Sequence, residues 1–332
     1  MVRFLIRRLI ALVVLLIATS LVTFVLFVAG PANPAADSCG KSCTPERIQA
    51  AKVALGLNRP LSTQYLDYMK GLVAGREMGP PDARFHCDWP CFGTSFQNNR
   101  FVWTSIKAGL PYTISIAVGA AVIFLSFGLT IGTLAGLKKG TWIDKLAVGF
   151  ASIGVSLPVP LIGLTFIWLI IGRLGLLPYP SNGITSPLSP DPYHWARNYL
   201  LPWVTLALIY GASYVRLTRA TMIETMGEDY IRTARAKGLP SRTVTLKHGL
   251  RAAITPIVTI FGLDLGTLLG GAVLTETIYS VPGIGRLAVR GALDEDLPVT
   301  MGVVLFAAFF IIVANIVVDI LYAVIDPRVR LE

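Results

Sequence analysis

The chain has 332 residues, of which 54% are hydrophobic and only 14% are charged. Soluble domains carry about 25% charged residues, so this chain has too few polar side chains to cover itself in water. These values exclude a soluble enzyme, a disordered tail and a coiled coil, and they predict an integral membrane protein. The net charge of +10 fits an excess of Lys and Arg in cytoplasmic loops, and no nucleic-acid-binding motif accompanies it.

Six apolar stretches are long enough to cross a membrane, which takes about 20 helical residues. They lie near residues 9–29, 112–136, 146–171, 199–217, 254–274 and 300–324. The sequence therefore predicts an all-α membrane protein with six transmembrane helices, in which residues 1–29 form the N-terminal tail and the first helix. Pro158 and Pro160 predict a kink in the third stretch, because each proline removes a backbone hydrogen-bond donor.

The distribution of Lys and Arg predicts that both termini are cytoplasmic. Of the 29 basic residues, 16 lie on the side of the termini, nine lie in the long segment 30–107, and four lie in the short loops opposite. Long translocated segments contribute little to the charge rule, so the short loops decide the orientation. The first apolar stretch exceeds the roughly 7–15 apolar residues of a cleaved signal peptide, which favours a retained anchor over a cleaved leader.

The segment 30–107 has mixed polarity and predicts a small exported subdomain. It holds all four cysteines, Cys39, Cys43, Cys87 and Cys91, as two C-x-x-x-C pairs. An even number of cysteines in an exported segment favours disulfides. We expect bridges that join one pair to the other, because closing a longer loop removes more entropy from the unfolded chain. A zinc or iron–sulfur site built from the four thiolates is the alternative.

One short pattern in this segment, Gly40-Lys41-Ser42, matches the end of a phosphate-binding loop. Ala35 stands where the first glycine of that loop belongs, and no predicted strand precedes it. The sequence therefore predicts no nucleotide site. We expect a chain that is not an enzyme, with no bound metal and no cofactor of its own.

The loop after the fourth apolar stretch carries the most informative pattern. It runs Glu228-Asp-Tyr-Ile-Arg-Thr-Ala-Arg-Ala-Lys-Gly-Leu-Pro240 and continues from Ser241 to Arg251. Gly238 is placed to end a short helix, and Ser241 can cap a second helix that returns to the membrane. Two short helices that meet at a glycine form a compact protrusion. A basic loop that only keeps the chain soluble and oriented is the alternative.

This loop resembles the EAA loop of ABC importer permeases, in the form typical of the B-type subunit of the dipeptide, oligopeptide and nickel family. Aligned on Gly238, residues 232–234 occupy the E-A-A position and residues 248–251 occupy the I-x-L-P position that follows it. Arg232 and Arg251 depart from the general pattern, which puts in doubt any role that needs a carboxylate at 232. The resemblance extends to residues 55–61, 262–276, 279–285 and 326–328, whereas residues 80–91 form an insertion.

The resemblance implies a type I ABC importer permease fold of six transmembrane helices, with the exported subdomain after the first helix. Residues 108–332 would form the permease core, and its coupling loop would lie at about 221–251. The implied partners are a second permease of C type, two ATPase subunits that bind ATP and Mg²⁺, and an exported solute-binding protein. The implied location is the bacterial cytoplasmic membrane, and the implied cargo is a peptide, with nickel or glutathione as alternatives.

The resemblance also implies roles for individual residues. The helix of the loop would fit a groove of an ATPase, with a contact face formed by Tyr230, Ala234, Ala236, Gly238 and Leu239. Arg232 and Arg235 would lie at the polar rim of that contact, and Glu228 would belong to the same coupling segment.

Asp264 is the strongest candidate in the membrane for the translocation path, because an ionisable side chain at that depth costs at least ~2.5–3.5 kcal/mol unless it faces water or a partner. Gly266 and Gly270 lie on the same stretch and permit close helix approach, which favours packing over gating. An ion-coupled secondary transporter that uses Asp264 and a membrane scaffold are the rival hypotheses. The absence of an inverted repeat argues against the first of these.

Overall fold

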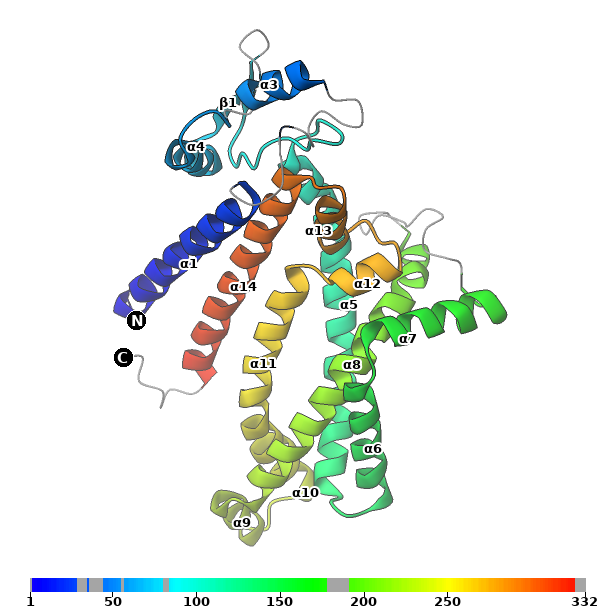
Figure 1. The fold of residues 1–332 in the computed structure, drawn as a ribbon. Coiled ribbons are helices and arrows are strands. Elements are labelled where there is room, and N and C mark those ends of the chain that lie inside the picture. The colour runs from blue at the N-terminus through cyan, green and yellow to red at the C-terminus, as the bar shows by residue number, and fades with distance from the viewer. Residues whose placement is uncertain are drawn as a thin grey trace.

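The computed structural model describes residues 2–28, 35, 44–54, 57–79, 84–177 and 191–325. Within these residues five helical segments are long and apolar enough to span a membrane, and a bent helix pair forms a sixth. The long helices are α1 (Val2–Val28), α5 (Val102–Leu137), α8 (Pro192–Gly227), α11 (Arg251–Leu269) and α14 (Leu297–Ile325). The prediction of an all-α, multi-pass membrane protein is confirmed (Figure 1).

The bent pair corresponds to the third predicted span. It consists of α6 (Trp142–Ser156), followed by α7 (Val159–Phe166) and the π-helix η1 (Ile167–Arg173), and the two halves meet at 99°. Leu157 and Pro158 have extended backbone at the break. Pro158 explains the conformation of Leu157, because a proline pushes the residue before it out of the helical region. The predicted kink is confirmed, and it is sharp enough that α7 projects sideways from the bundle (Figure 1).

Small residues bring the helices of the bundle close together. On α5, Gly128, Gly132 and Gly136 face Tyr214, Thr218 and Met222 of α8, and a Cβ at Gly136 would lie 2.8 Å from the Cβ of Met222. On α11, Gly262, Gly266 and Gly270 face Val318, Ala314 and Ala307 of α14. Such four-residue spacing of glycines is how helices pack in a membrane, where apolar burial between helices provides little driving force.

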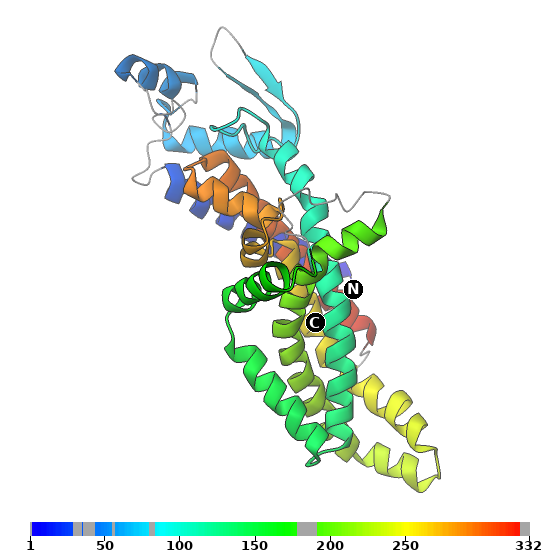
Figure 2. The ribbon, with the colours of Figure 1, turned by 90° about the vertical axis from the view of Figure 1, so that its right-hand side faces the viewer.

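The segment after α1 forms a small lobe at one end of the bundle, which we call the lobe end (Figure 2). The lobe contains α3 (Pro45–Ala54), α4 (Leu61–Ala74) and an antiparallel pair of strands, β1 (Arg76–Met78) with β2 (Phe85–Cys87). Tyr68 of α4 packs with Phe24 of α1 and with Met301 and Leu305 of α14, which places the lobe on these two helices. The free ends of α1 and α14 both point away from the lobe (Figure 1).

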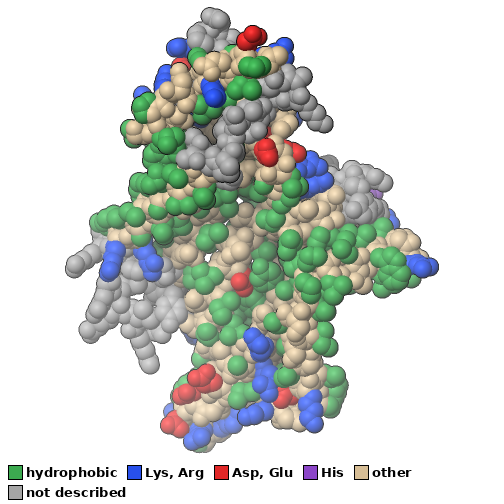
Figure 3. Space-filling view, viewed as in Figure 1, with side chains coloured by type: hydrophobic (Ala, Val, Ile, Leu, Met, Phe, Trp, Pro, Cys, Tyr) green, Lys and Arg blue, Asp and Glu red, His purple; other side chains and the backbone are tan. Residues whose placement is uncertain are grey.

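The opposite end of the bundle, which we call the loop end, carries α9 (Asp229–Ala236), α10 (Ser241–Thr243) and the π-helix η2 (Val244–Leu250). From there α11 runs back toward the lobe end, where it leads into α12 (Val273–Ile278) and α13 (Ile284–Leu293). The two ends of the molecule are therefore joined directly by the chain from α9 to α13. Charged side chains gather at both ends, and hydrophobic ones cover most of the surface between them (Figure 3).

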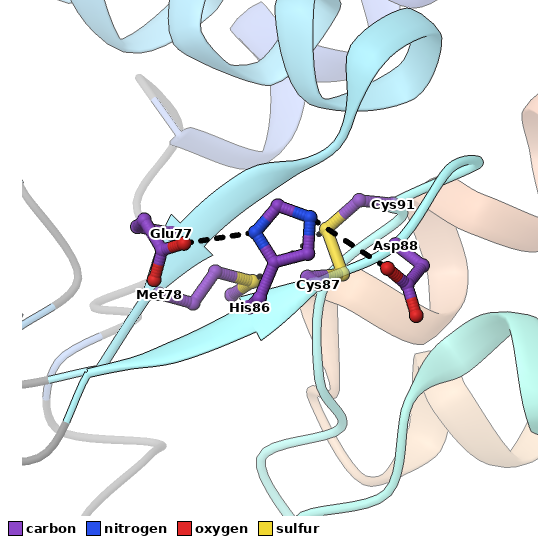
Figure 4. Close-up of a disulfide and its surroundings, with 6 residues drawn as sticks. All are labelled: Glu77, Met78, His86, Cys87, Asp88 and Cys91. Atoms are coloured by element: carbon purple, nitrogen blue, oxygen red, sulfur yellow. Dashed lines mark hydrogen bonds and ion pairs between the residues drawn. A yellow bond between two sulfur atoms is a disulfide. The ribbon is translucent and has the colours of Figure 1, made fainter.

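The lobe contains one described disulfide, between Cys87 and Cys91 (Figure 4). The expected bridges between the two cysteine pairs are therefore wrong for these two residues, while Cys39 and Cys43 lie outside the described residues. Loop-closure entropy is a property of the unfolded chain only. In the folded chain the turn after β2 brings the Cα atoms of Cys87 and Cys91 to 5.6 Å, a distance that suits a disulfide.

Candidate functional site

Residues 228–250 at the loop end form a compact protrusion, which we call the loop knob. It has a small apolar core of its own: Ile231 and Ala234 of α9 are buried against Val244 of η2, with Met226 packed beside them. These contacts hold α9 against the segment that leads into α11. A force applied to α9 therefore acts on α11 as well.

The loop knob turns at Gly238, which confirms the prediction that this glycine ends the helix. Its φ is +75°, a conformation that side chains with a Cβ rarely adopt. The Gly238 N–H donates to the Arg235 carbonyl at 2.9 Å and the Leu239 N–H donates to the Ala234 carbonyl at 3.3 Å. This pair of bonds is the Schellman arrangement, which satisfies the last carbonyls of a helix.

The structure divides the predicted contact residues into two groups. Those exposed on the loop knob are Glu228, Tyr230, Arg232, Arg235, Ala236, Gly238 and Leu239. Ala234 is only 7% exposed and belongs to the core of the loop knob, so its placement on the outer contact face is corrected. The helical period causes this, because Ala234 lies three residues after the fully buried Ile231 and shares its face.

A second correction concerns the start of the returning helix. Pro240, and not Ser241, occupies the N-cap position of α10, and no side chain caps it. The Pro240 carbonyl accepts the first helical hydrogen bond, from the Val244 N–H at 3.1 Å. Ser241 is therefore the first residue inside the helix, one position after the cap.

The exposed face of the loop knob is mixed in character. The ring of Tyr230 is 45% exposed and Leu239 is 39% exposed, which leaves two apolar side chains for a partner. Partial burial, and then the nearby Glu228 carboxylate, raise the pKa of the Tyr230 phenol, so this side chain stays a neutral hydroxyl. Arg232 lies 3.3 Å from Asp229 in an exposed ion pair, which contributes little to stability.

Within the bundle, the carboxylate of Asp264 lies where α11 meets α8. It accepts a hydrogen bond from the Tyr214 hydroxyl at 2.8 Å and is half-buried. Beside it, α8 and α11 border a hollow of about 320 Å³ lined by Ser213, Tyr214, Arg216, Leu217, Ala220 and Ile260. The sequence around Arg216 gives no indication that this residue lines a hollow.

Gly266 and Gly270 lie on a different face of α11 from Asp264. Both face α14, where they pack against Ala314 and Ala307, whereas Asp264 faces α8. The structure therefore separates the three residues that the sequence grouped. The two glycines have a packing role here, whereas Asp264 is joined to the hollow through its hydrogen bond to Tyr214, which lines it.

Two polar anchors in the bundle have no counterpart in the sequence analysis. The Arg219 guanidinium of α8 forms an ion pair with Asp144 of α6, in which Nη2 and Oδ2 are 2.9 Å apart. At the lobe end, Glu276 of α12 is fully buried and bonds to Thr113 of α5. In each pair the two residues are far apart in the chain. The sequence shows only a charged residue near the end of an apolar stretch and does not indicate its partner.

The described residues contain no group of three or more His, Cys, Asp or Glu side chains that could hold a metal ion. In the lobe, His86 lies 2.8 Å from Glu77 and 3.6 Å from Asp88, all three on the exposed surface (Figure 4). Cys87 and Cys91 are bonded to each other and supply no thiolate.

Comparisons with known proteins identify the family of this chain. A family model described as binding-protein-dependent transport system inner membrane component matches residues 128–331, and the model for the N-terminal part of such components matches residues 1–117. The dipeptide transport system permease protein DppB of Escherichia coli K12 is 35% identical over 99% of both chains. DppB of Alkalihalophilus pseudofirmus is 34% identical over 98% of both chains.

The fold has a match among solved structures as well. A chain of the MetNI methionine ABC transporter in inward-facing conformations aligns with a TM-score of 0.53, at 15% identity, over 68% of this chain and 97% of that chain. This likeness concerns the fold alone and agrees with the type I permease fold that the sequence predicted. The chain belongs to the family of binding-protein-dependent transport system inner membrane components, as an ABC importer permease similar to DppB.

Proposed function

We propose that this chain forms half of a path by which di- or oligopeptides enter a bacterial cell, with the energy supplied by separate ATPase subunits. The observation that carries the proposal is the identity of 35% to a dipeptide permease along 99% of the chain. A putative peptide transport system permease of Brucella abortus, 35% identical over 96% of this chain, supports the same class of cargo. The similarity covers both the lobe and the bundle, so the whole chain takes part.

The loop knob is the proposed contact with an ATPase. Its own apolar core and its tight bonding at Gly238 make it a rigid body, which suits a helix that docks in a groove. The contact face consists of Tyr230, Ala236, Gly238 and Leu239, with Glu228, Arg232 and Arg235 around it. ATP and Mg²⁺ belong to the ATPase subunits, and this chain binds no cofactor.

Asp264 is the proposed polar element of the path. A carboxylate in the span is costly unless it meets water or a partner. Asp264 is half-buried and bonds to Tyr214, which lines a hollow together with Arg216. The hydroxyl of Tyr214 fixes its orientation. A second permease of C type would close the other half of the path.

The proposed setting is the bacterial cytoplasmic membrane. Both termini and the loop knob face the cytoplasm, and the lobe faces outward, where an exported solute-binding protein delivers the peptide. The excess of basic residues at the loop end and in the N-terminal tail supports this orientation.

The test is reconstitution in vesicles of this chain with a C-type permease, the ATPases and the binding protein. We expect uptake of a labelled dipeptide that requires ATP and stops when the ATPases are left out. Uptake by this chain alone, driven by a proton or sodium gradient, would instead show an ion-coupled transporter. Unlabelled dipeptide, nickel and glutathione added as competitors identify the cargo, and competition by either of the last two alone would contradict the peptide assignment.

A further inference from the structure

The buried carboxylate of Glu276 joins three helices at the lobe end. Glu276 lies on α12, the short helix that follows α11, and has no exposed surface. One carboxylate oxygen accepts a hydrogen bond from the Thr113 hydroxyl of α5 at 2.7 Å, and the other accepts from the Arg286 N–H of α13 at 2.9 Å. A single side chain thus ties α12 to α5 and to the first turn of α13.

Thr113 completes this arrangement. Its hydroxyl donates its proton to Glu276 and accepts a hydrogen bond from the Ile284 N–H at 2.9 Å. The backbone N–H groups of the first turn of a helix have no partner within the helix, and they favour a negative charge nearby. Glu276 and Thr113 together satisfy this turn of α13, so each bond of the cluster depends on the others.

Glycines make the close approach possible. A Cβ at Gly283 would overlap the carboxyl group of Glu276, with Oε1 at 2.6 Å, and a Cβ at Gly285 would lie 2.7 Å from the Cα of Val273. On α5, a Cβ at Gly109 would lie 3.2 Å from the carbonyl carbon of Gly283. The turn between α12 and α13 therefore packs so closely around the carboxylate that no side chain larger than glycine fits at Gly283 or Gly285.

The same turn has a second attachment, to α8. The Tyr279 hydroxyl and the Thr205 hydroxyl of α8 are hydrogen-bonded at 2.7 Å, and both side chains are fully buried. The Arg286 guanidinium closes the turn by donating to the Ser280 carbonyl. Residues 273–286 are thus attached to α5 and α8, the two helices that pack most extensively against each other.

The position of this cluster in the chain suggests what it does. α11 runs from the loop knob to α12, a length of about 28 Å for its 19 residues. Its loop end is attached to the loop knob, and its lobe end is attached through Glu276. A displacement of the loop knob is therefore transmitted along α11 to its lobe end, which Glu276 holds in place.

We propose that Glu276 is a positioning residue for transport, which anchors the lobe end of the α11–α12 segment to α5. With the anchor intact, movement of the loop knob changes the angle of α11 relative to α5 and α8. Without it, α12 shifts with α11, and the movement is lost before it opens the path. The inference rests on the proposed function, because it concerns how ATP-driven movement reaches the path.

The experiment uses the assembled complex in vesicles, with peptide uptake and ATP hydrolysis measured on the same samples. Glu276→Gln leaves the size of the side chain unchanged but replaces one carboxylate oxygen by an amide N–H₂ group. This group would face one of the two donors, the Thr113 hydroxyl or the Arg286 backbone N–H, and could not accept a hydrogen bond from it. Thr113→Val removes the hydroxyl at nearly constant shape, and Thr113→Ser keeps it. Asp294→Asn, at an exposed carboxylate of the same end, serves as the matched control.

We expect Glu276→Gln and Thr113→Val to lower the peptide taken up per ATP hydrolysed at least tenfold, with ATP hydrolysis within about twofold of wild type. Thr113→Ser and Asp294→Asn should keep the wild-type ratio. A purely structural role would lower uptake and hydrolysis together and leave the ratio unchanged, which would overturn the inference, as would a ratio within twofold of wild type. If Glu276→Gln does not assemble, the Thr113 pair decides by the same criterion.

The wild-type complex separates this inference from the proposed function. Absence of ATP-dependent peptide uptake by wild type contradicts the proposed function itself. Uptake by wild type together with an unchanged ratio in the Glu276 and Thr113 variants contradicts only the anchoring role.

Discussion

Gly238 shows how a single residue shapes the surface of the loop knob, the proposed contact with an ATPase. Its positive φ turns the chain sharply after α9, and the two backbone bonds at this point close the helix without any side chain. In the described part of the chain, no atom lies within 4 Å of the place where a Cβ would stand. The position is therefore open to a partner, and only the backbone conformation restricts what can occupy it.

This geometry predicts different outcomes for two substitutions at residue 238. Asn tolerates a positive φ, so Gly238→Asn should keep most of the uptake. Gly238→Arg adds bulk and charge to the contact face and should lower peptide uptake at least tenfold while the complex still assembles. Uptake assays and size-exclusion chromatography of both variants provide the measurement. Wild-type uptake by Gly238→Arg would remove the loop knob from the mechanism.

At the scale of helices, the bundle depends on two glycine seams, between α5 and α8 and between α11 and α14. The glycines of these seams differ from a glycine outside them in the atoms that an added methyl group would contact. At Gly132 a Cβ would lie 2.8 Å from the Val215 carbonyl oxygen, whereas at Gly149 of α6 no described atom lies within 4 Å. Packing against a neighbouring helix therefore decides the effect of a substitution, even where the helical propensity is the same.

The two positions allow a matched comparison. Gly132→Ala should lower the thermal midpoint of the detergent-solubilised protein, because overpacking costs typically about 1–3 kcal/mol. Gly149→Ala should leave the midpoint unchanged or raise it, since alanine favours a helix over glycine by roughly 0.5–1 kcal/mol. Equal midpoints for the two variants would show that α5 and α8 do not pack as closely as described.

At the scale of the whole molecule, many charged side chains gather at the lobe end and the loop end, and hydrophobic side chains cover much of the surface between them (Figure 3). The lobe is attached to the bundle by polar contacts as well as by its apolar seat. The Ser95 hydroxyl donates to the buried Asp296 at the start of α14, and the Phe96 N–H donates to the same carboxylate at 3.2 Å. The lobe and the turn before α14 therefore form one surface at the lobe end, which is the proposed outward side.

This arrangement predicts which sites a protease reaches from each side of the membrane. In inside-out vesicles, trypsin should cleave the loop knob at the exposed Arg232, Arg235 and Lys237 and leave the lobe intact. In right-side-out vesicles it should cleave the lobe, for example at the exposed Arg84, and leave the loop knob intact. Mass spectrometry of the fragments gives the result, and cleavage of both regions from one side would contradict the proposed orientation.

The sequence by itself determined the membrane class, the positions of the spans, the kink before Pro158 and the glycine that ends α9. Each of these depends on residues that are neighbours in the chain: an apolar run, a proline or a helix C-cap. The order of residues in the loop also sufficed to identify the family, because the pattern around Gly238 is local.

Other features were decided only by the tertiary structure. The hydrogen bond between Thr113 and Glu276 joins residues 163 positions apart, and nothing near either residue indicates the other. Likewise, Ala234 is buried because η2 packs against α9, and the 99° angle between α6 and α7 is a property of the folded helices. The Cys87–Cys91 bond forms because the turn after β2 brings the two residues together, although a bridge over a longer loop would remove more entropy from the unfolded chain. Long-range contacts of this kind are set by how helices fit together in space, which composition and periodicity do not specify.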